Sequence, residues 1–309
     1  MLSSLTACSG PQSTLATRGP RAEFIAEIWW AMFAGAVLIQ LLVVTLAIHA
    51  YRRRGPLTAR SRRALIVGGG VLLPVGVLTA LVLYSHYLGA SLRDPIGGAL
   101  EIEVVGHRFW WETRYPGGVA TANELRLPVG RPVRLALRSE DVIHSFWIPS
   151  LAGKLDLIPG RVNRMWIQAD QAGEWRGQCA EFCGSLHAHM DLRVVGLPPD
   201  EFDGWLARQR QPAKAPTSAA ARRGEQAFLD HGCAACHGIR GTAADGRGGP
   251  DLTHAAERAR RDLLWPPQRP RPAEWIVDSH RASPQAAAAV ATLDPATVAD
   301  LARYLEELR

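Results

Sequence analysis

Two cysteines, two histidines and a methionine form the most chemically suggestive cluster of this chain. Cys179 and Cys183 lie four residues apart, His187 and Met190 follow within seven more, and His144 precedes Cys179 by 35 residues. Two thiolates can bridge two metal ions, an imidazole can terminate each, and a thioether is a weak ligand that suits copper. The cysteines and histidines also fit a zinc site, and the cysteines alone a disulfide, which would leave the histidines without a role. Met190 favours dinuclear copper over both.

A second pair of cysteines occurs in the pattern Cys233-Ala-Ala-Cys236-His237. In C-x-x-C-H, two thiols add to the vinyl groups of haem and the histidine binds the iron. Zinc and a thioredoxin-like dithiol are the alternatives, but no second C-x-x-C follows and no βαβ pattern surrounds this one. The pattern therefore predicts a covalently bound haem c.

The sixth ligand of this haem is less evident, because no methionine follows the haem motif. The four methionines are Met1, Met32, Met165 and Met190. His280 is the first candidate and His254 the second, and an open or water-ligated iron is the other alternative. Methionine ligation raises the potential of a haem, so its replacement or loss predicts a lower potential.

Two apolar stretches dominate the N-terminal part of the chain. Residues 24–51 and 64–88 are each long enough to cross a bilayer as a helix, and buried core helices are the alternative. The segment 51–63 between them contains six arginines and no acidic residue. Its charge of +6 equals the net charge of the whole chain. The positive-inside rule places this loop in the cytoplasm and both chain ends outside. The basic charge thus indicates membrane topology and does not indicate a nucleic-acid partner.

Short stretches of alternating polar and apolar residues follow, separated by turn clusters. They cover residues 101–105, 107–115, 124–129, 132–138, 142–148, 161–169 and 189–195. Strands of this length and spacing predict an all-β, cupredoxin-like sandwich or barrel. His189 is interpreted as an ordinary residue of the last strand.

The remaining residues divide into a linker and a helical domain. Residues 207–218 are basic and rich in proline and alanine, which indicates a semi-extended linker. Helices are expected over 221–232 and 294–309. The predicted organisation is an N-terminal segment (1–23), a two-helix membrane anchor (24–90), a cupredoxin-like domain (91–206), the linker (207–218) and an all-α haem domain (219–309).

Cys8 ends a Leu-Thr-Ala-Cys sequence that resembles the cleavage box of a lipoprotein. The residues before it are too few for a signal peptide. We therefore hypothesise that translation starts upstream and that Cys8 is the lipidated first residue of the mature chain. A chance cysteine in a terminal segment is the alternative.

Three motifs together resemble cytochrome c oxidase subunit II over residues 24–206. They are H-S-F-W-I-P from His144, G-K-L-D-L-I-P-G-R from Gly153, and G-Q-C-A-E-F-C-G-S-L-H-A-H-M from Gly177. The resemblance implies the dinuclear copper centre CuA. Its ligands would be the bridging thiolates of Cys179 and Cys183, the imidazoles of His144 and His187, the Met190 thioether and the Glu181 carbonyl. It also implies that the Glu181 side chain reaches a magnesium at the boundary with subunit I, near Asp156.

The chain departs from this family at two places. The family's G-H-Q-W-x-W stretch, whose first tryptophan receives electrons from cytochrome c, ends here in Phe109-Trp110-Trp111. Phe109 thus replaces the entry tryptophan in this electron-entry region. Val67 stands where many members carry a glutamate that leads protons to subunit I. Glu27, near the outer end of the first apolar stretch, is interpreted as a solvated residue.

Residues 219–309 resemble a class I cytochrome c, so the whole chain resembles subunit II of a haem-copper oxidase with its donor fused on. This implies an electron-transfer subunit in the bacterial inner membrane, with both folded domains on the periplasmic face. Electrons would come from a small cytochrome c or a quinol:cytochrome c oxidoreductase and pass through haem c and CuA to subunit I. There, with further oxidase subunits, O2 would be reduced to water and protons translocated.

Three alternatives remain for the function. The chain could serve a nitric oxide reductase that contains CuA, or act as a membrane-tethered redox or gas sensor. The third alternative, a quinol-oxidase subunit that has lost copper, is opposed by the complete ligand set.

Overall fold

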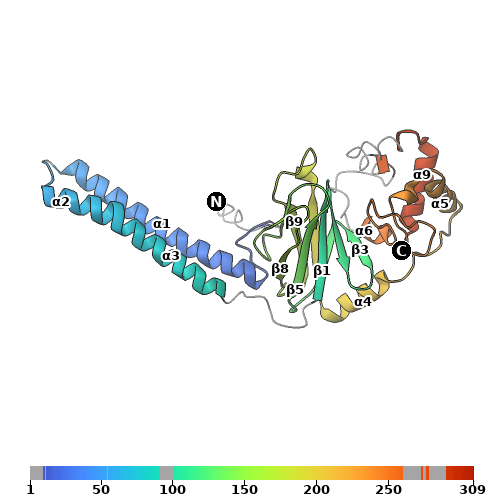
Figure 1. The fold of residues 1–309 in the computed structure, drawn as a ribbon, viewed down its shortest axis with the longest axis horizontal. Coiled ribbons are helices and arrows are strands. Elements are labelled where there is room, and N and C mark those ends of the chain that lie inside the picture. Colours follow the sequence, from blue (N-terminus) through green and yellow to red (C-terminus); the bar gives the residue numbers. More distant parts are fainter. Residues whose placement is uncertain are drawn as a thin grey trace, which may run out of the picture.

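The computed structural model describes Gly10 and residues 12–53, 55–90, 100–259, 273, 276, 277 and 290–309. A long helical hairpin leads into a β-sandwich, and a small helical domain follows (Figure 1). The predicted order of two apolar helices, an all-β domain and an all-α domain is confirmed. Cys8 and His280 lie outside the described residues.

Both apolar stretches form helices long and apolar enough to cross a membrane. The first is α1 (Pro20–Arg52). The second is continuous through α2 (Ala59–Ala64), the π-helix η2 (Leu65–Leu72) and α3 (Leu73–Ala90). Pro74 has no N–H to donate, and the turn before it is a π-turn in which the Leu73 N–H reaches the Gly68 carbonyl. The helix therefore continues past the proline.

The two helices lie side by side (Figure 1) and are joined near the end of the hairpin that is closer to the sandwich. The Tyr84 hydroxyl donates a hydrogen bond to the Glu27 carboxylate at 2.8 Å. Glu27 is exposed, as expected, but it also has a partner on the second helix.

The segment before α1 packs directly against the sandwich. The Arg18 N–H donates to the Ser150 carbonyl at 2.7 Å, and the Arg18 carbonyl accepts from the Asp170 N–H at 2.9 Å. A Cβ at Gly19 would lie 2.2 Å from the Gln168 carbonyl oxygen, so only glycine fits there. The first helix therefore starts from the surface of the sandwich.

The sandwich consists of two five-stranded sheets. In spatial order, the first sheet contains β3 (Val119–Ala122), β2 (Trp110–Tyr115), β1 (Leu100–His107), β5 (Val133–Ser139) and β8 (Asn163–Ile167). The second contains β4 (Glu124–Pro128), β10 (Asp191–Leu197), β9 (Gly173–Cys179), β6 (His144–Trp147) and β7 (Leu155–Leu157). β1 with β5 and β4 with β10 are parallel pairs, and the other pairs are antiparallel.

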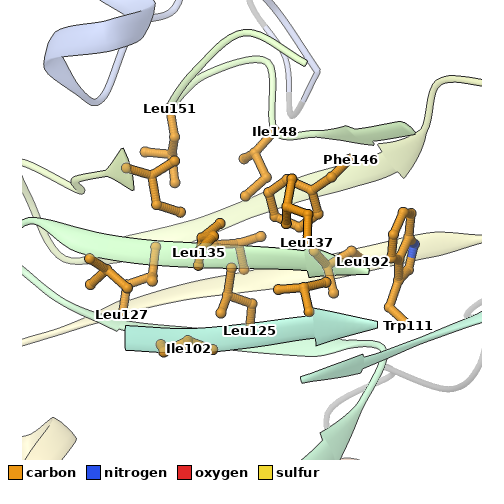
Figure 2. Close-up of a cluster of buried hydrophobic side chains, with 14 of the residues drawn as sticks. Ile102, Trp111, Leu125, Leu127, Leu135, Leu137, Phe146, Ile148, Leu151 and Leu192 are labelled. Carbon is orange, nitrogen blue, oxygen red and sulfur yellow. The ribbon is translucent and has the colours of Figure 1, made fainter. Parts of the chain in front are cut away.

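The core fills the space between the sheets (Figure 2). Leu135 and Leu137 of the first sheet meet Leu192 and Phe146 of the second, and all four are buried. Trp111 lies at one end of this row (Figure 2). The alternation of apolar residues along the strands explains the arrangement, because successive side chains point to opposite faces.

The structure corrects several of the strand predictions. The stretch 107–115 is not one strand, because residues 108 and 109 form a turn between β1 and β2. His189 belongs to the 3₁₀ helix η3 (His187–His189) and not to a strand. Strands β3, β7 and β9 were not predicted. Helix α4 (Pro199–Gln209), also not predicted, extends three residues into the expected linker.

The helical domain contains α5 (Ala219–Asp230), η4 (Cys233–Ala235), α6 (Ala255–Ala259) and α9 (Pro295–Glu307). The expected first and last helices are confirmed as α5 and α9. They cross closely at Gly224, where a Cβ would lie 2.1 Å from the Asp300 carbonyl oxygen. Phe228 of α5 and Tyr304 of α9 pack beside this crossing, with ring centroids 5.9 Å apart.

The α5–α9 crossing should tolerate only glycine. We expect Gly224→Ala to destabilise the helical domain by about 1–3 kcal/mol, because the added methyl group must push two helices apart. Gly204→Ala in α4 is the control, because its Cβ would meet only Arg208 Nη1 at 3.5 Å. Thermal unfolding of the full chain, followed by haem absorption, measures the effect. Equal midpoints for the two variants would contradict the prediction.

Candidate metal centres

The predicted copper ligands converge at one end of the sandwich. Cys179 Sγ lies 4.0 Å from Cys183 Sγ, 3.8 Å from His144 Nδ1 and 3.2 Å from the Glu181 carbonyl oxygen. Cys183 Sγ lies 3.6 Å from His187 Nδ1 and 3.8 Å from Met190 Sδ. Both cysteines are free thiols, so the described structure does not contain the alternative disulfide. Each sulfur has the other sulfur and one imidazole nitrogen as neighbours, which suits a pair of bridged metal ions.

Strand pairing brings the distant His144 to the cysteine loop. His144 begins β6 and Cys179 ends β9, and these strands are antiparallel neighbours. The Ala180 N–H donates to the Ser145 carbonyl at 2.9 Å, which fixes the start of the loop. Across the sandwich, a Cβ at Gly106 of β1 would lie 2.8 Å from His144 Cδ2. Glycine at 106 therefore leaves room for the ligand ring.

Asp141 orients the His144 ring. His144 Nε2 lies 2.8 Å from Asp141 Oδ1, and a proton shared there leaves Nδ1 facing Cys179. Burial raises the pKa of the Asp141 carboxyl, but hydrogen bonds from His144 and from the Val142 and Arg108 N–H groups lower it more. The net effect is a lowered pKa, so Asp141 remains a carboxylate at neutral pH.

Trp111 and Phe109, two residues of the predicted electron-entry region, contact the cysteine loop. Trp111 is fully buried, and its Nε1–H donates to the Met190 carbonyl at 3.3 Å. The Phe109 ring covers Gly184, where φ is +134° and a Cβ would lie 2.9 Å from the ring. Trp110 follows Phe109 but stacks on His107, with the rings 4.3 Å apart. Because neighbouring strand residues point to opposite faces, Trp110 faces away from the buried Trp111.

The two thiols differ in acidity. Burial raises the pKa of Cys179, but hydrogen bonds with His144 and with the backbone outweigh it and lower the value to about 7. Burial and the adjacent charge of Cys179 raise the pKa of Cys183 to about 12. The pair thus loses its first proton near neutral pH, and a bound metal would have to displace the second.

The haem motif forms a local site in the helical domain. His237 Nδ1 donates to the Pro250 carbonyl at 2.9 Å, which leaves Nε2 available to an iron. A Cβ at Gly249 would lie 2.7 Å from His237 Cε1, so the chain passes close behind the ring. Cys233 is half-buried, Cys236 is exposed, and both are free thiols. These residues fit covalent attachment of a haem.

Three other predictions concern the imidazole of His254 and the carboxylates of Glu181 and Asp156, which are not among the ligand contacts described above. His254 is buried in the helical domain, next to Thr253, whose hydroxyl accepts the Arg240 N–H. Glu181 has an exposed side chain, and Asp156 is exposed on β7. A sixth haem ligand and a magnesium site therefore stay predictions.

Sequence reasoning missed the residues that support the ligands. Asp141 was not singled out, although an acid three residues before a ligand histidine is a usable signal. Gly106 was not singled out, and Trp111 was noted only as part of the predicted electron-entry region. Their contacts with His144 and Met190 cross between two sheets, which no local pattern reveals.

Comparison with known proteins gives the same assignment for both folded domains. The family described as "Cytochrome C oxidase subunit II, periplasmic domain" matches residues 117–196, and "Cytochrome c" matches residues 221–309. Cytochrome c oxidase subunit 2 of Alkalihalophilus pseudofirmus is 33% identical over 82% of this chain and 78% of its own length. That of Bacillus sp. strain PS3 is 32% identical over 77% of this chain and 71% of its own length.

A solved structure is similar to part of the chain. The crystal structure of the periplasmic domain of subunit II of cytochrome oxidase from Bradyrhizobium japonicum is 30% identical, with a TM-score of 0.36. The match covers 38% of this chain and 97% of that one.

The anchor, the sandwich and the helical domain define subunit II of a haem-copper oxidase with a fused cytochrome c domain. The matched domains imply a CuA copper centre and a haem c, and subunit I is the partner within the complex. Specifically, the chain belongs to the cytochrome c oxidase subunit 2 family.

The contact between Asp141 and His144 should control copper affinity. We expect Asp141→Asn to weaken copper binding about 10- to 100-fold, because the ring loses its orienting carboxylate. Glu140→Gln is the matched control, since Glu140 is the exposed neighbouring acid. Competition with a copper chelator measures the affinity. If both variants bind copper as the unmodified chain does, Asp141 does not orient the ligand.

The difference in pKa between Cys179 and Cys183 should be measurable by alkylation of the copper-free chain with its haem attached. We expect Cys179 to react with iodoacetamide first, with a midpoint of about pH 7, because its thiolate forms as the pH rises through its pKa. Cys183 should stay protonated and unreactive over the same range, although it is equally buried. Mass spectrometry after short pulses between about pH 6 and 9 measures both. Equal labelling of the two residues would contradict the stepwise ionisation.

Proposed function

We propose that this chain passes electrons from a haem at Cys233, Cys236 and His237 to a dinuclear copper centre and then to subunit I. Oxygen would be reduced to water there, with proton translocation. The observation that carries the proposal is the convergence of two thiols, two imidazoles and a thioether within 4.0 Å of neighbouring ligand atoms. Copper bound by soft thiolates supplies one-electron transfer.

The protein's own part is to keep four of these ligands away from water and fixed in place. Cys179, Cys183, Met190 and His144 are all at most 6% exposed. A dense core on one side and the Phe109 ring on the other limit their movement. Ligands that cannot rearrange suit a site that must accept and release electrons without binding a substrate.

The electron donor to this haem would be a small cytochrome c or a quinol:cytochrome c oxidoreductase. The copper centre, in turn, would receive its electrons from this haem. The fusion of the haem domain to the chain supports this, since attachment replaces a bimolecular encounter. Phe109 at the entry position supports the same conclusion, because an external cytochrome would not find the family's tryptophan there.

We place the chain in the bacterial inner membrane with both metal domains in the periplasm. The arginine loop 51–63 between the two apolar helices supports this orientation. A magnesium bound by Glu181 at the boundary with subunit I, His280 as sixth haem ligand and lipidation of Cys8 are further parts of the proposal.

Neighbouring histidines of the cysteine loop provide a sharp test. In the copper-loaded full chain, low-temperature EPR should show a mixed-valence two-copper signal. His187→Ala should abolish it, because one copper loses its imidazole, whereas His189→Ala should retain it, because His189 is exposed and outside the ligand set. The haem signal in the same spectrum should be unchanged in both variants. Loss of the signal in both, or its absence from the unmodified chain, would contradict the copper assignment.

A further inference from the structure

The segment between the two metal domains is bound along the helical domain. The Ala213 N–H donates to the Arg240 carbonyl at 2.9 Å, and the Lys214 N–H donates to the Arg309 carbonyl at 3.3 Å. The Glu307 carboxylate accepts hydrogen bonds from the backbone N–H groups of Thr217 and Ser218. Hydrogen bonding with the Ser218 side chain and with the Thr217 backbone lowers its pKa to about 2. The segment expected as a semi-extended linker is therefore bound to the helical domain along part of its length.

Arg240 connects this segment to the sandwich. Its Nη2 donates to the Gly118 carbonyl at 2.6 Å, and its Nη1 donates to the Arg210 carbonyl at 3.3 Å. The Arg240 backbone is fixed by its own N–H, which donates to the Thr253 hydroxyl. A planar guanidinium with five donors suits two separate carbonyl groups, so one side chain of the helical domain binds two points of the other domain.

The sandwich side of this contact is the turn 116–118 and the end of α4. Arg210 Nη2 donates to the Pro116 carbonyl at 3.3 Å and covers Gly117, where a Cβ would lie 2.7 Å from Arg210 Nε. Gln209 is 5% exposed, and its Nε2 donates to Glu257 of α6 at 3.1 Å. In Figure 1, α6 lies on the side of the helical domain that faces β3.

Helix α4 packs against the sandwich through Trp205, so its C-terminal end has a fixed position. Trp205 is 1% exposed and packs against Tyr115, with ring centroids 5.0 Å apart. The Arg126 guanidinium lies 4.8 Å from the Trp205 ring and is paired with the buried Glu124 at 2.6 Å. Movement of α4 would expose the buried Trp205 ring to water and break its contact with the Arg126 guanidinium, and both changes cost free energy.

We propose that Gln209, Arg210, Arg240 and Glu257 form an interdomain latch that docks the chain's own haem domain on the turn 116–118. The haem domain is then held in one position on the sandwich instead of diffusing at the end of a flexible linker. The latch would fix the distance and orientation from which the proposed electron transfer starts. This consequence rests on the proposed function. The docking itself is independent of it and is tested without turnover.

Trypsin cleavage after Arg210 reports on the latch, because Arg240 binds the carbonyl of that scissile bond. In the full chain with haem and copper bound, Arg240→Ala should accelerate this cleavage about two- to tenfold, since the open state gains population when the hydrogen bonds are lost. Arg247→Ala is the matched control, because Arg247 is an exposed arginine of the same domain. Mass spectrometry of the fragments measures the rate.

A second variant distinguishes loss of the latch from misfolding of the haem domain as the cause of faster cleavage. Glu257→Ala removes the α4–α6 contact from a different element and should accelerate the same cleavage, with haem absorption and unfolding temperature unchanged. Cleavage of both variants at the rate of the Arg247→Ala control would overturn the latch. That result would leave the copper assignment intact, because the EPR signal does not depend on docking.

Discussion

The approach of the His144 ring to strand β1 is the contact on which the copper site depends. It requires glycine at 106, because any Cβ there would overlap the ring. It also requires the two sheets to be correctly packed, since β1 and β6 belong to different sheets. With His144 in place, Asp141 directs Nδ1 toward Cys179, and Trp111 fixes the backbone of Met190. A displacement of the ring would disturb all of these contacts, because a dense core transmits strain.

The sandwich acts as the frame for three attachments. The membrane anchor joins it through Arg18 and Gly19, the copper loop extends from β9, and the haem domain contacts its turn 116–118. The copper ligands lie near Trp111, and the turn lies beyond the other end of β2. At about 3.3 Å per residue, the strand itself separates these two regions by roughly 15–20 Å. Metal binding and domain docking therefore use separate parts of one rigid body.

The two metal centres depend on the fold in different ways. The copper ligands come from β6, from the end of β9 and from the loop before β10, so they meet only in the folded sandwich. The haem ligands lie within five consecutive residues, and the fold adds mainly the Pro250 carbonyl that orients His237. We therefore expect copper affinity to report on folding of the whole sandwich, since binding to a preformed site is coupled to folding.

The sequence by itself determined the ligand types, the haem motif, the two apolar helices and the all-β and all-α domains. These depend on local spacing and periodicity, which Cys179 to Met190 and Cys233 to His237 display directly. Strand β9 was missed because Gly173 and Gly177 lower its strand propensity, yet Gly177 is needed where a Cβ would lie 3.1 Å from the Trp147 carbonyl. Only the tertiary structure decided the contacts of Gly106, Asp141, Trp111 and Arg240. Each joins segments that are distant in the chain or lie in different layers, so its partner is set by packing and not by neighbouring residues.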